Sequence, residues 1–172
     1  ECQQATQLST LIEETQRISY HVIGLSETKR KESLSCTWND GTAIFLGARE
    51  SGSTSGGIGF IVAPGFAKYV TNVTFHSHRF GVLTATLTKD ISISIIQVYA
   101  PMCDSSEEQH ENFNDDLGEL IRSQKSSCVV VSGDFNARIG SRRQGERFIG
   151  PNSAEPRNAA GETLANFCEI FH

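Results

Sequence analysis

The chain has 172 residues, 38% of them hydrophobic and 20% charged, and its net charge is −5. This composition suits a single globular domain, and we expect residues 1–172 to share one core. No apolar stretch approaches the roughly 20 residues that cross a bilayer, and the polar start lacks signal-peptide features, so we expect no membrane partner. The cysteines form no Cys-x-x-Cys pair and are 5 in number, which argues against a zinc cage and a complete disulfide framework and favours reduced thiols inside a cell.

The spacing of apolar residues predicts an N-terminal helix followed by short strands. Gln3 to Ile18 carries Leu8, Leu11, Ile12 and Ile18 at helical spacing, which predicts a helix that faces a sheet. Strands are expected near His21–Leu25, Thr42–Leu46, Gly57–Ala63, Tyr69–Phe75, Gly81–Leu87 and Ile91–Tyr99. Because their connections are short, these strands should pair as antiparallel neighbours.

The second half of the chain predicts two helices around one further strand. Ser105-Ser106-Glu107-Glu108 is typical of a helix start, and the apolar residues that follow it give this helix one apolar face. Cys128–Ser132 is a continuous apolar run, which predicts a central strand buried on both faces with Cys128 in the core. Gly140 to Pro156 is rich in turn residues, and Gly161–Phe171 predicts a last helix. Periodicity alone therefore gives a mixture of α and β elements, with helices outside packed sheets.

A carboxylate and a carboxamide follow the apolar strand directly, in Gly133-Asp134-Phe135-Asn136-Ala137. If the chain stays extended there, Asp134 and Asn136 leave the same side of the backbone, an arrangement that suits a water to be deprotonated and oriented. The alternative is that both residues only shape a turn, as these residue types often do.

Two other predicted strands also end in functional side chains. One runs out into Glu27, and the other ends at Tyr99 just before a proline. Each residue has an ordinary alternative, because Glu27 could be a solvated carboxylate and Tyr99 an aromatic at the rim. If the three strand ends converge, they form a site for a hard cation beside a group that activates water.

These motifs, in this order, resemble those of the endonuclease/exonuclease/phosphatase superfamily of metal-dependent phosphodiesterases. Ser26-Glu27-Thr28, Val98-Tyr99-Ala100-Pro101 and the segment Gly133 to Ala137 are similar to its glutamate, tyrosine and Gly-Asp-Phe-Asn motifs. Ser55 to Phe60 and Arg157 to Leu164 resemble more narrowly the endonuclease domain of RTE-type non-long-terminal-repeat retrotransposons and the related craniofacial-development-like sequences. The resemblance implies a four-layer α/β (α+β) sandwich of two mainly antiparallel sheets flanked by helices.

The resemblance also implies a role for each motif residue. Glu27 would bind Mg²⁺ or Mn²⁺, Asp134 would activate the attacking water, and Asn136 would orient that water or the scissile phosphate. Tyr99 would support the phosphate and its developing charge. Arg79 lies where relatives carry an arginine before a core strand and would contact substrate, although a solvated arginine at a strand start is the alternative.

The chain departs from the family pattern at both ends, so we expect the fold to be incomplete at both termini. It lacks the opening strand whose asparagine reaches metal and phosphate in relatives. His172 follows Ile170-Phe171 instead of Ser-Asp, so we do not interpret it as the catalytic histidine. We therefore expect these 172 residues to be a weak or inactive nuclease by themselves.

The charge pattern bears on the expected partner, which the resemblance implies is DNA. A net negative charge disfavours nucleic acid, but Arg138 opens a cluster with Arg142, Arg143 and Arg147 beside the predicted site. This loop, Arg138 above all, could bind a phosphate backbone while the acidic stretch from Asp104 to Glu119 faces away; a solvated, flexible loop is the alternative. The longer protein would carry a downstream reverse-transcriptase domain, and the nucleus is one candidate compartment.

Other interpretations stay open. The same fold serves phosphatases and other phosphodiesterases, and a degenerate module that binds a partner or nucleic acid without catalysis is a second class. His76 and His78 lack a third zinc ligand, which favours an exposed strand end over a metal site. Ser55 to Gly59 lacks the lysine of a phosphate loop and predicts a tight hairpin entry.

Overall fold

The computed structural model describes the backbone of residues 2–171 and the side chains of residues 9–171, so the predictions for Leu8 and His172 lie outside the described side chains. The strands form 2 sheets of 4. The first sheet has the order β1-β4-β3-β2 and is antiparallel throughout, with β1 (Val22–Ser26), β2 (Leu34–Thr37), β3 (Ala43–Leu46) and β4 (Ile58–Val62). The second has the order β5-β6-β7-β8, with β5 (Val70–Phe75), β6 (Phe80–Thr86), β7 (Ser92–Tyr99) and β8 (Cys128–Asp134).

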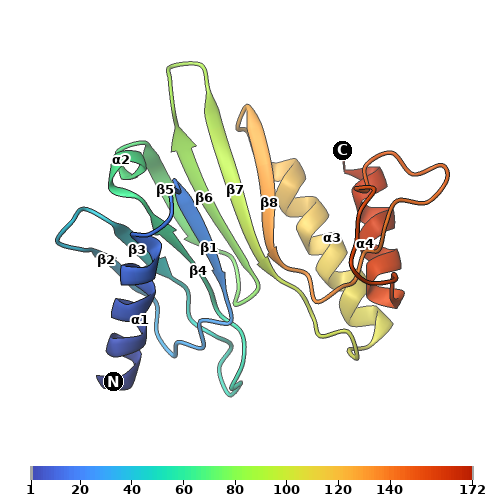
Figure 1. The fold of residues 1–172 in the computed structure, drawn as a ribbon, viewed down its shortest axis with the longest axis horizontal. Helices are drawn as coiled ribbons and strands as arrows, with labels where there is room; N and C mark the ends of the chain where they lie inside the picture. Colours follow the sequence, from blue (N-terminus) through green and yellow to red (C-terminus); the bar gives the residue numbers. More distant parts are fainter. Residues whose placement is uncertain (1, 172) are drawn as a thin grey trace.

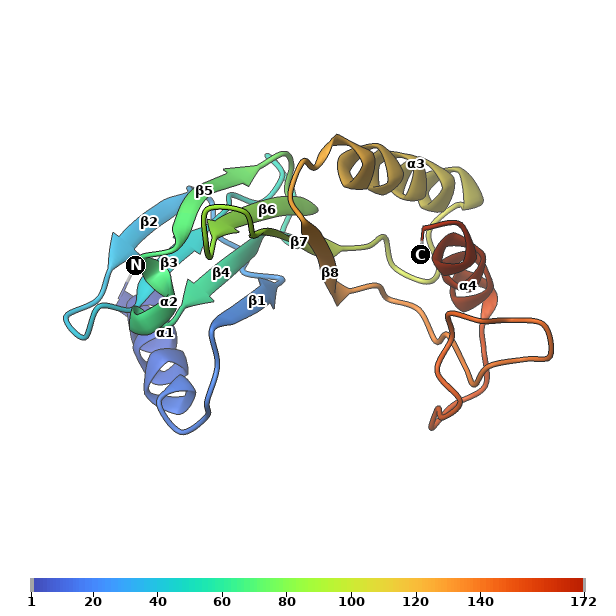
Figure 2. The same cartoon turned by 90° about the horizontal axis from the view of Figure 1, so that it is seen from above.

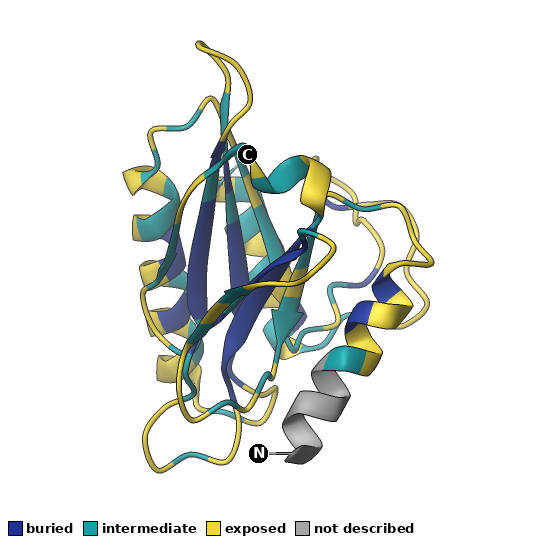
Figure 3. Cartoon of the chain, turned by 90° about the vertical axis from the view of Figure 1, so that its left-hand side faces the viewer, coloured by how far each residue is buried: buried dark blue, intermediate teal, exposed yellow. Residues whose placement is uncertain are grey.

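The sheets pack face to face between helices, and the alternation of side chains along the strands explains why (Figures 1 and 2). Phe60 and Val62 of β4 turn inward and meet Leu83 and Ala85 of β6 in the core between the sheets. The opposite faces are covered by helices: α1 (Cys2–Thr15) on the first sheet, and α3 (Glu107–Ser123) and α4 (Ala159–Ile170) beside the second. Buried residues accordingly line the central strands, whereas the helices show exposed outer faces (Figure 3). The predicted fold class of two mainly antiparallel sheets flanked by helices is confirmed.

Helix α3 begins where the sequence predicts. Ser106 accepts a hydrogen bond from the Gln109 N–H, and the Gln109 side chain accepts one from the Ser106 N–H, which closes a capping box. Its buried Phe113 and Leu117 lie against the outer face of the second sheet, with Phe113 stacked on Phe80 at 4.9 Å between ring centroids. This helix is the crossover that makes β7 and β8 parallel.

Two elements are missed by the sequence pattern, and one helix is shorter than expected. β2 and the single-turn helix α2 (Pro64–Ala67) are too short to give a periodic signal. Helix α1 ends at Thr15, whose hydroxyl donates to the Ile12 carbonyl at 2.7 Å, so Ile18 lies beyond the helix and is 58% exposed. Within residues 2–171 no helix is long and apolar enough to cross a membrane.

The prediction that Cys128–Ser132 forms a central strand buried on both faces is wrong. β8 is the last strand of its sheet, and only β7 pairs with it among the described residues. Its outer face is covered, because Val129 and Val131 pack against the cluster under α3. Its inner face lies beyond the edge of the first sheet, so Val130 is 41% exposed and Cys128 is also exposed rather than in the core.

A buried glutamine connects the two sheets at their shared margin. Gln97 on the inner face of β7 is 2% exposed. Its Nε2 donates to Ser26 Oγ on β1 at 3.1 Å, and its Oε1 accepts from Ser132 Oγ on β8 at 2.9 Å. Ser26 Oγ in turn donates to the Val98 carbonyl at 3.2 Å. These bonds satisfy the buried amide and fix the last residues of three strands relative to one another.

We predict that Gly24→Ala destabilises the fold through Gln97. A Cβ at residue 24 would lie 1.9 Å from Gln97 Oε1, so the amide must leave its serine partners, at a cost of about 1–3 kcal/mol for unsatisfied buried groups. Urea unfolding measures the loss. Gly65→Ala, where a Cβ would meet nothing within 4 Å, is the control.

The same substitution in a Gln97→Ala background should cost little, because the obstructing amide is gone. Additive losses in the double variant would contradict the proposed cause.

Candidate active site

Glu27 stands at the exit of β1 in an unusual backbone conformation. Its φ is 57°, in the left-handed region, and this turns the chain sharply out of the strand. The carboxylate accepts a hydrogen bond from the Tyr99 hydroxyl on Oε1 at 3.1 Å, and the Lys29 ammonium lies 3.5 Å from Oε2. The neighbouring Thr28 and Lys29 N–H groups donate to the carbonyls of Gly57 and Gly56, which holds this exit against the start of β4.

Tyr99 ends β7 and connects Glu27 to β8. It is 5% exposed, and its backbone pairs in register with Asp134. Burial raises the pKa of the Tyr99 hydroxyl above its ordinary value of 10.0, and the hydrogen bond and charge of Glu27 and the charge of Asp134 add to the rise. The phenol is therefore a neutral hydrogen-bond donor at physiological pH.

Arg79 lies directly beside Tyr99. Its Nη1 donates to the Tyr99 carbonyl at 3.1 Å, and its guanidinium lies 5.7 Å from the centre of the Tyr99 ring. The structure thus places this sequence-predicted residue at the same strand ends as Glu27 and Tyr99.

The exit from β8 is a turn, the alternative that the residue types left open, and not an extended segment. Asn136 has a φ of 47°, and its N–H donates to Asp134 Oδ1 at 2.9 Å, which closes an Asx turn. Asn136 Nδ2 donates to the Ala100 carbonyl at 2.9 Å, so its amide is fixed against the end of β7. The turn interpretation is thus confirmed, and the turn fixes the orientation of both side chains.

The strand ends enclose a groove of about 600 Å³ on the side that β8 leaves uncovered. Gly24 and Ser26 line it from β1, Gln97 from β7, and Ser132 and Asp134 from β8. Gly133, also on its wall, has a φ of 141°, and a Cβ there would lie 2.1 Å from the Val98 carbonyl oxygen. Only glycine lets β8 approach β7 at this point.

The donor set fits a hard divalent cation that is held by few protein ligands. Within the described residues no group of 3 or more His, Cys, Asp or Glu side chains could hold a metal, which excludes a closed cage there. The two carboxylates, Glu27 and Asp134, and the Asn136 carboxamide oxygen are hard oxygen donors, and Mg²⁺ is usually bound by one or two carboxylates together with waters and substrate phosphates. Lys29 currently neutralises Glu27 and would have to move aside for such an ion.

The sequence analysis missed Lys29 and Gln97 as parts of this site. Lys29 follows the glutamate motif directly, but its left-handed backbone, with φ of 55°, cannot be inferred from residue type. Gln97 gave a signal that was overlooked: it is a polar residue on the strand face whose preceding inward positions are Ile93 and Ile95.

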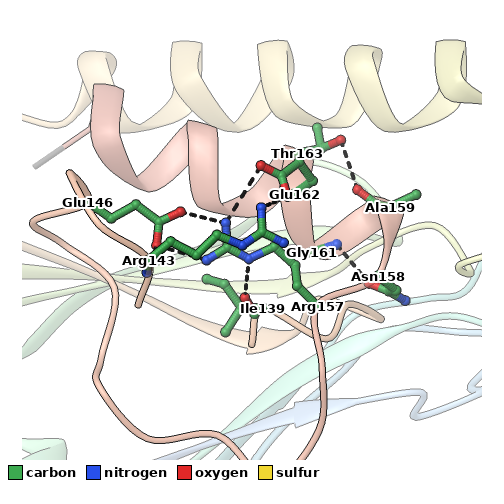
Figure 4. Close-up of polar contacts among 9 residues, drawn as sticks. All are labelled: Ile139, Arg143, Glu146, Arg157, Asn158, Ala159, Gly161, Glu162 and Thr163. Atoms are coloured by element: carbon green, nitrogen blue, oxygen red, sulfur yellow. Dashed lines mark hydrogen bonds and ion pairs between the residues drawn. The ribbon is translucent and has the colours of Figure 1, made fainter. Parts of the chain in front are cut away.

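The arginines after β8 are largely paired with acidic groups (Figure 4). Arg138 contacts Glu155 at 2.9 Å and Arg143 contacts Glu162 at 2.7 Å. Arg157, from the late motif, has a side chain only 2% exposed and makes a bidentate pair with Glu146. The loop is thus an ion-paired, turn-rich segment, and the predicted substrate contact of Arg138 would require exchange of Glu155 for phosphate.

His76 and His78 do not share a partner. His78 lies 3.7 Å from Glu50, and burial lowers its pKa below 6.5. The His76 N–H donates to the Phe80 carbonyl at 2.9 Å, so both histidines lie in the connection between β5 and β6.

The chain is distantly similar to craniofacial development protein 2. It is 25% identical to the protein of Bos taurus over 162 residues and 24% identical to that of Tragulus javanicus, in each case over 94% of this chain. It spans 27% and 28% of the lengths of these relatives, about a quarter. The resemblance to craniofacial-development-like sequences that the motifs predict is confirmed.

Among solved structures, the chain is similar to TDP2 from C. elegans. One structure aligns with 82% of this chain and 46% of that chain at 13% identity and a TM-score of 0.47. A truncated form aligns over 82% and 60% at 14% identity, again with a TM-score of 0.47. No protein-family model matches the chain.

We predict that Glu27→Gln lowers the pKa of Tyr99, because it removes a negative charge that disfavours the phenolate. Ultraviolet titration of the phenolate measures the shift, with Tyr99→Phe identifying the band. The pKa of Tyr99 is higher in the folded chain than in the unfolded chain. The protonated phenol therefore adds to the free energy of unfolding fully below about pH 10, and this contribution is lost as the pH rises through the folded-state pKa. Glu32→Gln, an exposed carboxylate in the next loop, should leave the titration unchanged; an unchanged titration in Glu27→Gln would refute the contact.

A second prediction concerns the ion pair between Arg157 and Glu146. The hydrogen bonds from Arg157, followed by that from the Arg143 N–H, lower the pKa of Glu146 from 4.5 to about 2. This contribution to stability is therefore complete above pH 4.5 and declines as the pH falls toward 2. Urea unfolding should show that wild type has a higher free energy of unfolding than Arg157→Met and that this difference becomes smaller below pH 4.5.

Arg17→Met is the matched control, because Arg17 pairs with Glu14 on the surface at side-chain exposures of 75% and 57%. The difference in free energy of unfolding between wild type and Arg17→Met should be small at every pH. A pH-independent difference for Arg157→Met would mean that the pair does not hold Glu146 ionised.

Proposed function

We propose that this chain is a Mg²⁺-dependent or Mn²⁺-dependent phosphodiesterase, and specifically a DNA-nicking endonuclease domain of a retroelement-derived protein. One observation carries the proposal. The Tyr99 hydroxyl donates a hydrogen bond to Glu27, and the Tyr99 backbone pairs in register with Asp134, so both acidic residues lie beside the end of β7. The similarity to craniofacial development protein 2 covers the same motifs and supports it.

In this proposal Asp134 is the general base. Its Oδ1 is held by the Asn136 N–H, which orients the carboxylate while Oδ2 stays available to take a proton from water. Because Asn136 Nδ2 is committed to the Ala100 carbonyl, its Oδ1 is the atom that accepts a hydrogen bond from the attacking water.

Tyr99 and Arg79 serve the phosphate. A phenol whose pKa is raised keeps its proton. The Tyr99 hydroxyl donates this proton to Glu27 in the structure, and it would donate to the charge that develops on the phosphate once Glu27 binds the ion instead. The Arg79 guanidinium lies beside the Tyr99 ring, where its remaining N–H groups can bind phosphate oxygens. Arg138 is the proposed contact to more distant substrate phosphates.

Glu27 is the proposed metal ligand, whereas Asp134 and Asn136 are assigned to the attacking water. When bound, the ion withdraws charge from the phosphate and lowers the pKa of nearby water. DNA, a reverse-transcriptase domain in the longer protein, and action in the nucleus are parts of the same proposal.

A non-catalytic binding module is the second candidate, and one set of contacts favours it. Lys29 neutralises Glu27, and Glu155 and Glu162 pair with Arg138 and Arg143. These pairs would keep the groups of the site occupied. A phosphatase or another phosphodiesterase of the same superfamily is the alternative within the enzyme class.

The test is Mg²⁺-dependent nicking of supercoiled plasmid by residues 1–172, with protein in excess so that weak activity registers. Asp134→Asn should reduce nicking by at least about 10²–10⁴-fold, because general base catalysis is lost. Glu27→Gln should instead raise the Mg²⁺ concentration needed, because one anionic oxygen ligand is gone.

Asp116→Asn, an exposed carboxylate on α3, is the matched control and should nick like wild type. Undiminished nicking by Asp134→Asn would end the mechanism. Binding of labelled DNA without any Mg²⁺-dependent cleavage would favour the binding module.

A further inference from the structure

The late motif, residues 157–164, is bound to the segment that leaves the candidate site. Asn158 forms two hydrogen bonds with the backbone of Arg138. The Arg138 N–H donates to Asn158 Oδ1 at 3.1 Å, and the Asn158 N–H donates to the Arg138 carbonyl at 3.1 Å. The same Oδ1 accepts the Gly161 N–H at 2.8 Å, which caps α4. One side chain therefore ties the start of a helix to a loop twenty residues earlier in the chain.

The neighbouring residues repeat this contact. Arg157 donates from Nε to the Ile139 carbonyl at 2.5 Å (Figure 4). Gly140 packs so closely on Arg157 that a Cβ there would lie 2.9 Å from it, and a Cβ on Gly161 would lie 1.8 Å from the Arg138 carbonyl oxygen. Residues 138 to 140 therefore all contact the segment at the start of α4.

On the other side, the exit of β8 is tied to β7. The Ala100 N–H donates to the Asp134 carbonyl at 2.8 Å, and Asn136 Nδ2 donates to the Ala100 carbonyl at 2.9 Å. Asn136 has a φ of 47°, a left-handed conformation that asparagine tolerates better than most residues other than glycine and in which its N–H reaches Asp134 Oδ1. Ala137 is the one residue between Asn136 and Arg138, the residue to which Asn158 is hydrogen-bonded.

We propose that Asn158 is a positioning residue for Asp134 and Asn136: by gripping the Arg138 peptide it holds Asn136 in the left-handed conformation that closes the turn on the Asp134 carboxylate. The inference rests on the proposed function for its kinetic consequence and on the hydrogen bonds alone for its structural one. Without the hydrogen bond between Asn158 and Arg138, the turn relaxes and the Asn136 N–H leaves Asp134 Oδ1. The Asp134 carboxylate then loses its orientation toward water.

A residue that merely caps α4 would behave differently. Asn158→Ala removes the acceptor for both the Arg138 and Gly161 N–H groups. Asn158→Asp keeps an oxygen in the same place and is an equally good cap, so it should preserve both bonds. Asn158→Ser keeps a cap for α4 with a shorter side chain, so the bond to Arg138 is the one it loses.

The first measurement is amide hydrogen exchange in residues 1–172 by NMR, which needs no activity. In Asn158→Ala and Asn158→Ser the Asn136 N–H should exchange about tenfold faster or more, whereas Asn158→Asp should match wild type. Ala165→Gly, which weakens the interior of α4 without touching Arg138, is the control for lost helix stability and should leave Asn136 protected. Equal exchange at Asn136 in all of these variants would overturn the proposal.

The second measurement is hydrolysis of bis(4-nitrophenyl) phosphate with Mg²⁺. Asn158→Ala and Asn158→Ser should lower kcat about 10- to 100-fold with KM nearly unchanged, because the base is misplaced while binding groups stay. Asn158→Asp and Ala165→Gly should keep kcat within about threefold of wild type. A loss in Ala165→Gly equal to that in Asn158→Ser would assign the effect to helix stability and overturn the positioning role. If wild type shows no hydrolysis, residues 1–172 are inactive by themselves, and the exchange data still decide the role of Asn158.

Discussion

The hydrogen bonds of Gln97 are the constraint on which the candidate site depends. Each sheet alone fixes its strands only through neighbours: β1 is joined to β4, and β8 to β7. Gln97 joins the two sets, because its amide bonds Ser26 on one sheet and Ser132 on the other. These serines lie one and two residues before Glu27 and Asp134. Burying an amide costs little when both of its ends are hydrogen-bonded, whereas an amide displaced from its partners costs a good part of a small domain's stability. The ends of β1, β7 and β8 therefore have one preferred arrangement.

Around this constraint, the two carboxylates are held in different ways. Glu27 turns out of a strand in a left-handed conformation and meets a phenol on one oxygen and an ammonium on the other. Asp134 stays in register with Tyr99 and is oriented by the Asx turn. The first carboxylate has a partner that a cation could replace, and the second has a partner that fixes direction without taking its charge. That difference matches the proposed division between a metal ligand and a base.

The sequence predicted most strands and helices because alternation and capping are local signals: the run that ends at Tyr99 and the Ser106 capping box are read from adjacent residues. It also predicted that Glu27, Tyr99 and Asp134 follow strand ends. It failed for β8, since an apolar run does not tell whether another strand covers its inner face, and Val130 remains 41% exposed. The turn at Asp134 and Asn136 was one of two alternatives, and the residue types alone did not decide between it and an extended exit. Register, burial and left-handed backbone are properties of the assembled sheets.

The charge distribution decides how such a site could hold a phosphodiester. The net charge of −5 gives no long-range attraction for nucleic acid, and the groove beside Asp134 is lined by hydroxyl, amide and backbone groups without a cationic side chain. In the following loop, Arg138 is paired with Glu155 and Arg143 with Glu162. Arg79 is the cation that lies against the candidate site without an acidic partner in the described part of the chain. Under the proposed function, substrate phosphate would draw most of its compensating charge from a divalent ion, so binding and chemistry would both depend on the metal.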